Sequence, residues 1–177
     1  MKKNVWTFGL IAGAISSIGF LFTAGSHDDI SLERGMLYGF ASMILGFSLT
    51  FVAVKNYRDK YNGGTITFGK ALMMGIYIAL IASSVYVAAW LIDYYFFIGD
   101  SFWDYYAQAA RTGLESEGAT EQAIAEQMAE IDGWKEMYKN PVVAGLITYT
   151  EILPVGIIIA LITAAILKRN TVKTQTT

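Results

Sequence analysis

The fold class of this chain is decided by residues 71–98, ALMMGIYIALIASSVYVAAWLIDYYFFI, in which the only charged side chain is Asp93. At 1.5 Å per residue, about 28 helical residues extend roughly 42 Å, whereas the hydrocarbon core of a bilayer is about 30 Å thick. The stretch therefore predicts a membrane-spanning helix that either tilts or ends in the headgroup region. We favour the second arrangement for Tyr94 to Phe97, because aromatic side chains with polar tips are enriched at that level.

Three further stretches are apolar enough to cross a bilayer, which takes about 20 mostly apolar residues. They cover residues 5–24, 35–54 and 142–167, and Glu151 is the only charge inside any of them. Charged residues make up 16% of the chain, whereas soluble domains contain about 25%. We therefore predict an all-α membrane protein with one membrane domain over residues 1–177. It is a four-transmembrane-helix bundle with an extracytoplasmic helical hairpin between spans three and four.

The charges of the connecting segments set the orientation of the predicted spans. Cations precede the first span, separate the second from the third and follow the fourth: Lys2, Lys3, Lys55, Arg58, Lys60, Lys70, Lys168, Arg169 and Lys173. The other two connections are acidic. By the positive-inside rule, both termini are expected in the cytoplasm. A cleaved signal peptide is the alternative interpretation of the first span, although its apolar run exceeds the roughly 7–15 residues of a signal core.

Small residues recur at helical spacing within each predicted span. Helices associate in lipid through close contact, so small residues mark their interfaces. The candidate packing residues of the first three spans are Gly9, Gly13, Gly35, Gly39, Ser42, Gly46 and Gly75. The fourth span carries Gly145, Gly156 and Ala160 in the same role. These stripes predict a compact bundle, and they would equally serve a homo-oligomer, so the sequence leaves both open.

Residues 99–140 form the largest segment outside the spans. Ser101 followed by Asp104 predicts a capping box at the start of one helix, which Gly118 ends, and Thr120 is predicted to cap a second helix. The second helix has one apolar face, formed by Ile124, Met128, Ile131, Trp134 and Tyr138. We interpret this lobe as a spacer packed on the bundle or the membrane surface. The alternatives are a docking surface for an extracytoplasmic protein and a lid over the bundle.

Glu151 is the one side chain that suggests chemistry inside the membrane. It lies about ten residues, or roughly 15 Å, into the fourth span, and no Lys or Arg occurs at similar depth. A carboxylate there costs several kcal/mol, so we expect the neutral, protonated form. Pro154 cannot donate a hydrogen bond to the carbonyl of Thr150, which leaves that acceptor open to Glu151. Thr148 and Tyr86 are the other expected partners.

Two interpretations of Glu151 remain open. In the structural one, a neutral acid clamps the kink at Pro154. In the functional one, Glu151 is a proton or cation site, with Pro154, Thr148 and Tyr86 around it and Asp93 on an access path from the water outside. The functional interpretation would make the protein a small proton- or cation-coupled transporter or channel.

Other classes of function find little support in the sequence. The chain has no cysteine, a single histidine and a net charge of −2, which gives no thiolate or His-rich metal site and no basic surface for nucleic acid. We also find no nucleotide-binding glycine loop and no Ser-His-Asp set. We therefore expect no enzyme, no cofactor and no metal. The leading interpretation is a structural or accessory component whose partners are the lipid bilayer, a second copy of itself and an extracytoplasmic protein.

Several local motifs resemble a known family. They are Met1-Lys-Lys-Asn-Val5, Lys55-Asn-Tyr-Arg-Asp-Lys-Tyr-Asn-Gly-Gly64, Thr67-Phe-Gly-Lys-Ala71, Lys135-Glu-Met-Tyr-Lys-Asn-Pro141, Glu151-Ile-Leu-Pro-Val-Gly156 and Leu167-Lys-Arg169. Together they resemble the four-span bacterial membrane proteins grouped as domain of unknown function 4199. The resemblance covers nearly the whole chain. It implies a location in the bacterial inner membrane and implies no activity.

Overall fold

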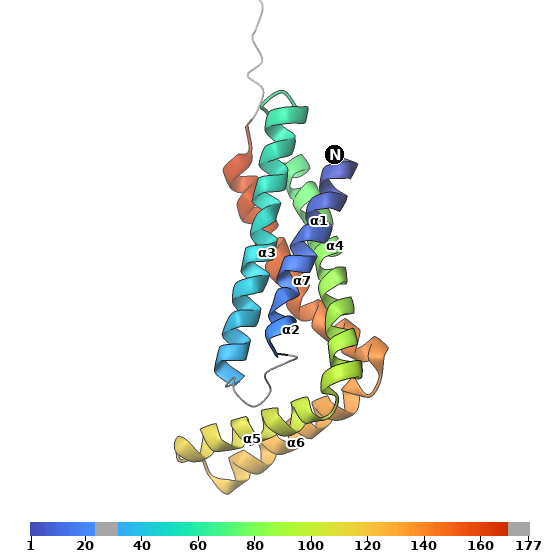
Figure 1. Cartoon of the computed structure of the whole chain (residues 1–177). Coiled ribbons are helices and arrows are strands. Elements are labelled where there is room, and N and C mark those ends of the chain that lie inside the picture. The colour runs from blue at the N-terminus through green and yellow to red at the C-terminus, as the bar shows by residue number, and fades with distance from the viewer. Residues whose placement is uncertain (24–31, 170–177) are drawn as a thin grey trace, which may run out of the picture.

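A computed structural model describes residues 1–23 and 32–169, which are helical almost throughout (Figure 1). The elements are α1 (Lys2–Ser16), α2 (Ile18–Thr23), α3 (Leu32–Tyr61), α4 (Phe68–Asp93), the π-helix η1 (Tyr94–Ile98), α5 (Ser101–Ser116), α6 (Glu121–Tyr138) and α7 (Pro141–Leu167). Within the described residues, the β-type pairing is an isolated bridge between Ile66 and Arg169. The predicted all-α class is confirmed. Lys173 lies outside the described residues, as do the surroundings of Gly35.

Three segments of the described chain are long and apolar enough to cross a bilayer: Leu37–Tyr61, Phe68–Ile98 and Pro141–Leu167. The first predicted span, residues 5–24, instead contains a break at Ser17 that separates α1 from α2. The Ser17 hydroxyl donates to the carbonyl oxygen of Gly13 over 2.8 Å. Bonds of this kind compete with the helical hydrogen bonds and bend helices. The apolar run gave no sign of this break, and Ala24, the last residue of the predicted span, lies outside the described residues.

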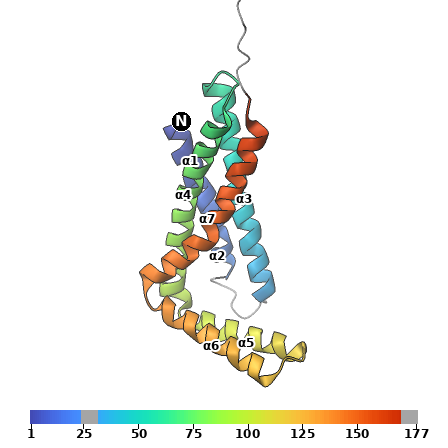
Figure 2. The same cartoon turned by 180° about the vertical axis from the view of Figure 1, so that it is seen from behind.

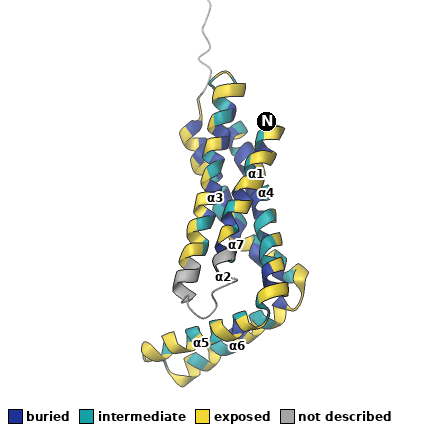
Figure 3. Cartoon of the chain, viewed as in Figure 1, coloured by how far each residue is buried: buried dark blue, intermediate teal, exposed yellow. Residues whose placement is uncertain are grey.

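α1, α3, α4 and α7 run alongside one another, and α5 and α6 lie side by side across one end (Figures 1 and 2). We call α5 and α6 with their flanking turns (residues 99–140) the lobe, and this end the lobe end. Figure 3 shows that burial is concentrated on the faces that the helices turn toward one another. The outward faces carry exposed apolar side chains such as Trp6, Leu45, Leu146 and Ile166. Helices that are apolar on both faces suit lipid surroundings.

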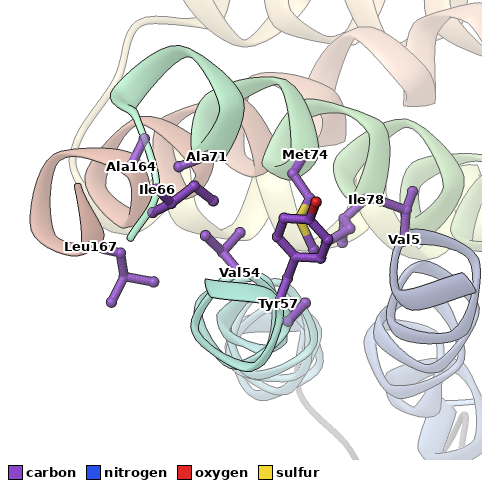
Figure 4. Packing of buried hydrophobic residues seen from close by; sticks show 10 residues of the cluster. Val5, Val54, Tyr57, Ile66, Ala71, Met74, Ile78, Ala164 and Leu167 are labelled. Atoms are coloured by element: carbon purple, nitrogen blue, oxygen red, sulfur yellow. The ribbon is translucent and has the colours of Figure 1, made fainter. Parts of the chain in front are cut away.

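The end opposite the lobe is closed by an apolar cluster drawn from four helices and the α3–α4 connection (Figure 4). The backbones of Ile66 and Arg169 exchange two hydrogen bonds, of 3.1 Å and 2.8 Å. Arg58 Nη1 also donates to the carbonyl oxygen of Leu167 over 3.4 Å, which satisfies one of the free carbonyls at the end of α7. These bonds tie the connection after α3 to the end of α7.

Glycines allow the helices to approach closely at several crossings. A Cβ atom on Gly46 of α3 would lie 2.5 Å from the carbonyl oxygen of Ala12 in α1 and closer still to Ser16 Oγ. A Cβ atom on Gly75 of α4 would lie 2.6 Å from the Cβ atom of Ala160 in α7. Gly39 differs, because a Cβ atom there would meet nothing within 4 Å. The small-residue stripe on α3 thus contains both a closely packed and an open position.

The lobe begins differently from the sequence prediction, and the prediction of a capping box formed by Ser101 and Asp104 is wrong. Ser101 is already helical, and the cap position is occupied by Asp100, whose side chain makes no capping hydrogen bond. Gly99 has φ +59° and turns the chain from η1 straight into α5, so that Ser101 Oγ donates back to the carbonyl oxygen of Ile98 over 2.5 Å. The second cap is confirmed: the Thr120 side chain accepts a hydrogen bond from the N–H of Ala123.

Candidate functional site

A buried aromatic junction joins the lobe to the long helices. Tyr94 of η1, Trp103 of α5 and Tyr138 of α6 are each less than a tenth exposed. Trp103 Nε1 donates to the Tyr94 hydroxyl over 2.9 Å. The ring of Tyr138 lies edge-on to both, with centroid distances of 5.3 Å to Tyr94 and 5.1 Å to Trp103. Edge-to-face pairs at these distances are favourable, so the junction holds the lobe in one position.

The π-helix η1 explains why Tyr94 takes part in this junction. The N–H of Gly99 reaches back five residues to the carbonyl of Tyr94 over 2.7 Å, which is the hydrogen-bond spacing of a π-helix. This wider turn leaves Tyr94 buried while Phe96 and Phe97 are 79% and 71% exposed. The exposed pair fits the predicted place in the headgroup region. Tyr94 does not fit a place in the headgroup region, because its side chain is buried and its hydroxyl accepts a hydrogen bond from the indole N–H of Trp103.

Glu151 lies near three of the polar side chains around the junction. Tyr86 of α4 and Tyr138 of α6 are both close enough to interact electrostatically with the Glu151 carboxyl. Thr148, one turn before Glu151, is buried; its Oγ1 donates to the carbonyl of Ala144 over 3.0 Å and lies 3.3 Å from the Tyr138 hydroxyl. The structure thus groups Glu151, Thr148 and Tyr86 around Tyr138.

The Glu151 carboxyl itself is exposed, and within the described residues it makes no hydrogen bond and no salt bridge. The expected hydrogen bonds from Glu151 to Thr148, Tyr86 and the carbonyl of Thr150 are therefore not formed. Thr148 already donates within its own helix. We missed Tyr138 as a member of this site, because in the sequence it belongs to the apolar face of the lobe and lies 13 positions from Glu151.

Pro154 and Asp93 stand apart from this group. α7 remains helical through Pro154, whose side chain is exposed. Asp93 is only 6% exposed and closes α4. It lies seven residues beyond Tyr86, which is roughly 10 Å along a helix. Within the described residues, no three His, Asp or Glu side chains gather in a way that could hold a metal ion.

The contacts of α4 show which side of α7 Glu151 occupies. On one side of the α4–α7 contact, the Tyr149 hydroxyl donates to the carbonyl of Leu80 and lies 3.3 Å from Ser84 Oγ, which is exposed. On the other side, Tyr86 packs against Phe20 of α2, with ring centroids 4.8 Å apart. Because Glu151 is near Tyr86, it lies on the side from which α2 approaches.

α3 leaves that side of α7 uncovered toward the lobe end. α3 touches α7 where Phe47 meets Gly156, at which a Cβ atom would lie 2.7 Å from Phe47 Cε1. From there toward the lobe, the two helices move apart (Figure 2). The α3 side chains along this stretch include Leu37 and Phe40, which are 65% and 55% exposed. The exposure of Glu151 follows from this divergence.

Comparison with known proteins places the chain in a family without giving it an activity. No curated protein and no solved structure matches it. The family described as "Protein of unknown function (DUF4199)" matches residues 7–169, which include almost every motif that carried the sequence resemblance. Because this match covers most of the chain, the protein belongs to the DUF4199 family of proteins of unknown function.

Proposed function

We propose that this protein crosses the bacterial inner membrane four times, with both termini in the cytoplasm, and serves as a non-enzymatic structural or accessory component. α3, α4 with η1, and α7 supply three spans, and α1 together with α2 supplies the fourth. The observation that carries the accessory role is the buried junction of Tyr94, Trp103 and Tyr138. A lobe fixed in this way presents a surface of constant shape outside the membrane. A partner can bind such a surface without the loss of conformational entropy that ordering the lobe would cost.

The lobe surface supports an extracytoplasmic protein as the partner. Exposed carboxylates follow the outward face of α6: Glu121, Glu126, Glu130 and Asp132. Glu136 is also exposed, and it pairs with Lys139 over 2.6 Å. Lys135 is turned toward α5, where its Nζ lies 2.9 Å from Asp104 Oδ1. Lys135 donates a hydrogen bond to the Asp104 carboxylate, which raises the pKa of Lys135. This cation is therefore paired within the lobe. The face left to a partner is acidic, and it complements a basic surface.

Single-cysteine labelling tests the topology, and the natural absence of cysteine makes it clean. In cells without an outer membrane, a membrane-impermeant maleimide is expected to label Glu130→Cys on the lobe. Lys3→Cys in the first turn of α1 and Lys60→Cys at the end of α3 are expected to react only after the membrane is permeabilised. All three positions are exposed in the folded chain. Labelling of Lys3→Cys from outside would contradict the four-span arrangement, and labelling of Lys60→Cys would contradict the orientation.

A small proton- or cation-coupled transporter is the second candidate, and the position of Glu151 beside Tyr86 and Tyr138 favours it. Proton flux is measured in liposomes with an internal pH-sensitive dye and an imposed membrane potential. The accessory role predicts no flux above that of empty liposomes, for the wild type and for Glu151→Gln alike. A wild-type flux that Glu151→Gln abolishes while remaining folded would overturn the accessory role and establish the transporter.

A further inference from the structure

We propose that the uncovered side of α7 around Glu151 binds an amphiphilic organic cation, such as a long-chain alkylammonium, that enters from the leaflet nearest the lobe. This inference goes beyond the accessory role, and it gives the second candidate function a class of ligand. It rests on the placement of Glu151 inside a membrane span, and it does not require that the protein transports anything.

The charge of the ligand follows from what surrounds Glu151. The carboxyl is exposed and makes no hydrogen bond or salt bridge within the residues that the structure describes. No Lys or Arg occurs in residues 71–98 or 142–167. Polar groups within a membrane are normally paired or hydrogen-bonded, because leaving them without a partner costs free energy. A ligand that brings its own positive charge supplies the partner that the described part of the chain does not.

The aromatic side chains nearby favour an organic cation over a metal ion. Tyr86 and Tyr138 lie within electrostatic reach of Glu151, and Phe20 and Trp90 continue the aromatic surface, with ring centroids 5.4 Å apart. Aromatic faces attract ammonium groups, and cages of such rings bind quaternary ammonium ions. Hard metal ions instead require about six oxygen ligands. One carboxylate beside hydroxyls that are partly engaged already does not offer that number.

The amphiphilic character of the ligand follows from the route that α3 leaves open. α3 and α7 diverge from the contact of Phe47 with Gly156 toward the lobe end (Figure 2). The α3 side chains on this stretch that lie nearest the face of Phe47, Phe40 and Leu37, are apolar and exposed. An alkyl chain lying there would remain in an apolar environment while its ammonium group reached Glu151. A fully hydrated cation would lose its water without this compensation.

Binding exchanges one positive charge for another at Glu151. With Glu151 in the neutral form expected inside a membrane, its O–H bond breaks, the proton passes to water, and the ammonium group becomes the counter-ion of the carboxylate. Among the residues that the structure describes, the hydroxyls of Tyr86 and Tyr138 are the titratable groups that interact electrostatically with this carboxyl, and Asp93 lies further along α4. One proton is therefore released for each cation bound.

Tetraphenylphosphonium is the probe for this site, and its binding is measured by equilibrium dialysis of the full chain in a neutral detergent. We expect saturable binding of one cation per chain. We expect Glu151→Gln to weaken it by about tenfold or more, which corresponds to about 1.4 kcal/mol. Glu130→Gln on the exposed face of α6 is the matched control and should bind like the wild type. Dodecyltrimethylammonium should compete with the probe, whereas uncharged dodecanol should not.

A second measurement guards against loss of folding in the variant. Dicyclohexylcarbodiimide modifies protonated carboxyls in apolar surroundings, and mass spectrometry locates the adduct. Saturating tetraphenylphosphonium is expected to protect Glu151 of the wild-type protein from this modification. The proposal is overturned by equal binding to wild type and a folded Glu151→Gln variant, by the absence of saturable binding, or by unprotected Glu151. The binding assay does not measure flux. It can therefore refute cation binding without refuting the topology or the accessory role, and the labelling and liposome experiments can refute those without refuting cation binding.

Discussion

Gly46→Ala is expected to lower the free energy of unfolding by about 3 kcal/mol, at the upper end of what overpacking costs. The added methyl group would stand 2.5 Å from the carbonyl oxygen of Ala12 and closer still to Ser16 Oγ. The Ser16 side chain can rotate away, but the backbone of Ala12 cannot move without shifting α1. The variant therefore forces α1 and α3 apart. Unfolding in mixed detergent micelles, followed by circular dichroism, measures the loss.

Gly39→Ala is the matched control, because Gly39 lies two turns away on the same helix and a Cβ atom there meets nothing within 4 Å. We expect its stability to remain within about 0.5 kcal/mol of the wild type, as for substitutions that touch no packed feature. If the two variants were equally stable, the close contact between α1 and α3 at Gly46 would be refuted.

Trp103→Ala is expected to cost about 3–5 kcal/mol, the usual range for truncating a buried Trp or Phe. The indole is 7% exposed, and it contributes both its ring contact with Tyr138 and its hydrogen bond to Tyr94. Its loss should free the lobe while leaving the long helices together. Hydrogen exchange is therefore expected to accelerate across α5 and α6 but not across α4 and α7.

Two further variants separate the contributions of Trp103. Trp103→Phe keeps a ring but leaves the buried Tyr94 hydroxyl without its donor, which costs about 1–3 kcal/mol. Gln108→Ala changes an exposed position on α5 and should exchange like the wild type. Unchanged exchange of the lobe in Trp103→Ala would mean that other contacts hold it, and the argument for a fixed accessory surface would fail.

Features that depend on residue type within one segment could be predicted from the sequence. The apolar lengths placed α3, α4 with η1, and α7, and Thr120 identified the start of α6. The prediction of a cap at Ser101 was wrong because the start of α5 depends on the direction in which the preceding π-helix ends, and a π-helical turn has no clear residue signature. The break at Ser17 failed for a similar reason, since a serine inside an apolar run is also common in unbroken helices.

Features that depend on the crossing of two helices could not be predicted in this way. Gly39 and Gly46 belong to one stripe, yet of these two only Gly46 would bring an added Cβ atom against a neighbouring helix, because α3 crosses α1 at that level. The sequence shows that Glu151 is the only charge in its apolar stretch, residues 142–167. Its exposure could not be predicted, because that depends on the divergence of α3 from α7. Tyr138 reaches the site only through the fold of the lobe, so no spacing along the chain could reveal it.

The paired backbones of Ile66 and Arg169 have a consequence for the order in which the protein is assembled during synthesis. The residues lie about 100 positions apart, which a ribosome takes roughly 5–20 s to cover. α1 and α3 precede Ile66 in the chain and α4 is made early in that interval, whereas the partner of Ile66 is made only at its end. Until Arg169 arrives, the backbone N–H and carbonyl groups of Ile66 in the α3–α4 connection can only bind water. Closing this end is a late event in biogenesis, which follows the arrival of the final helix.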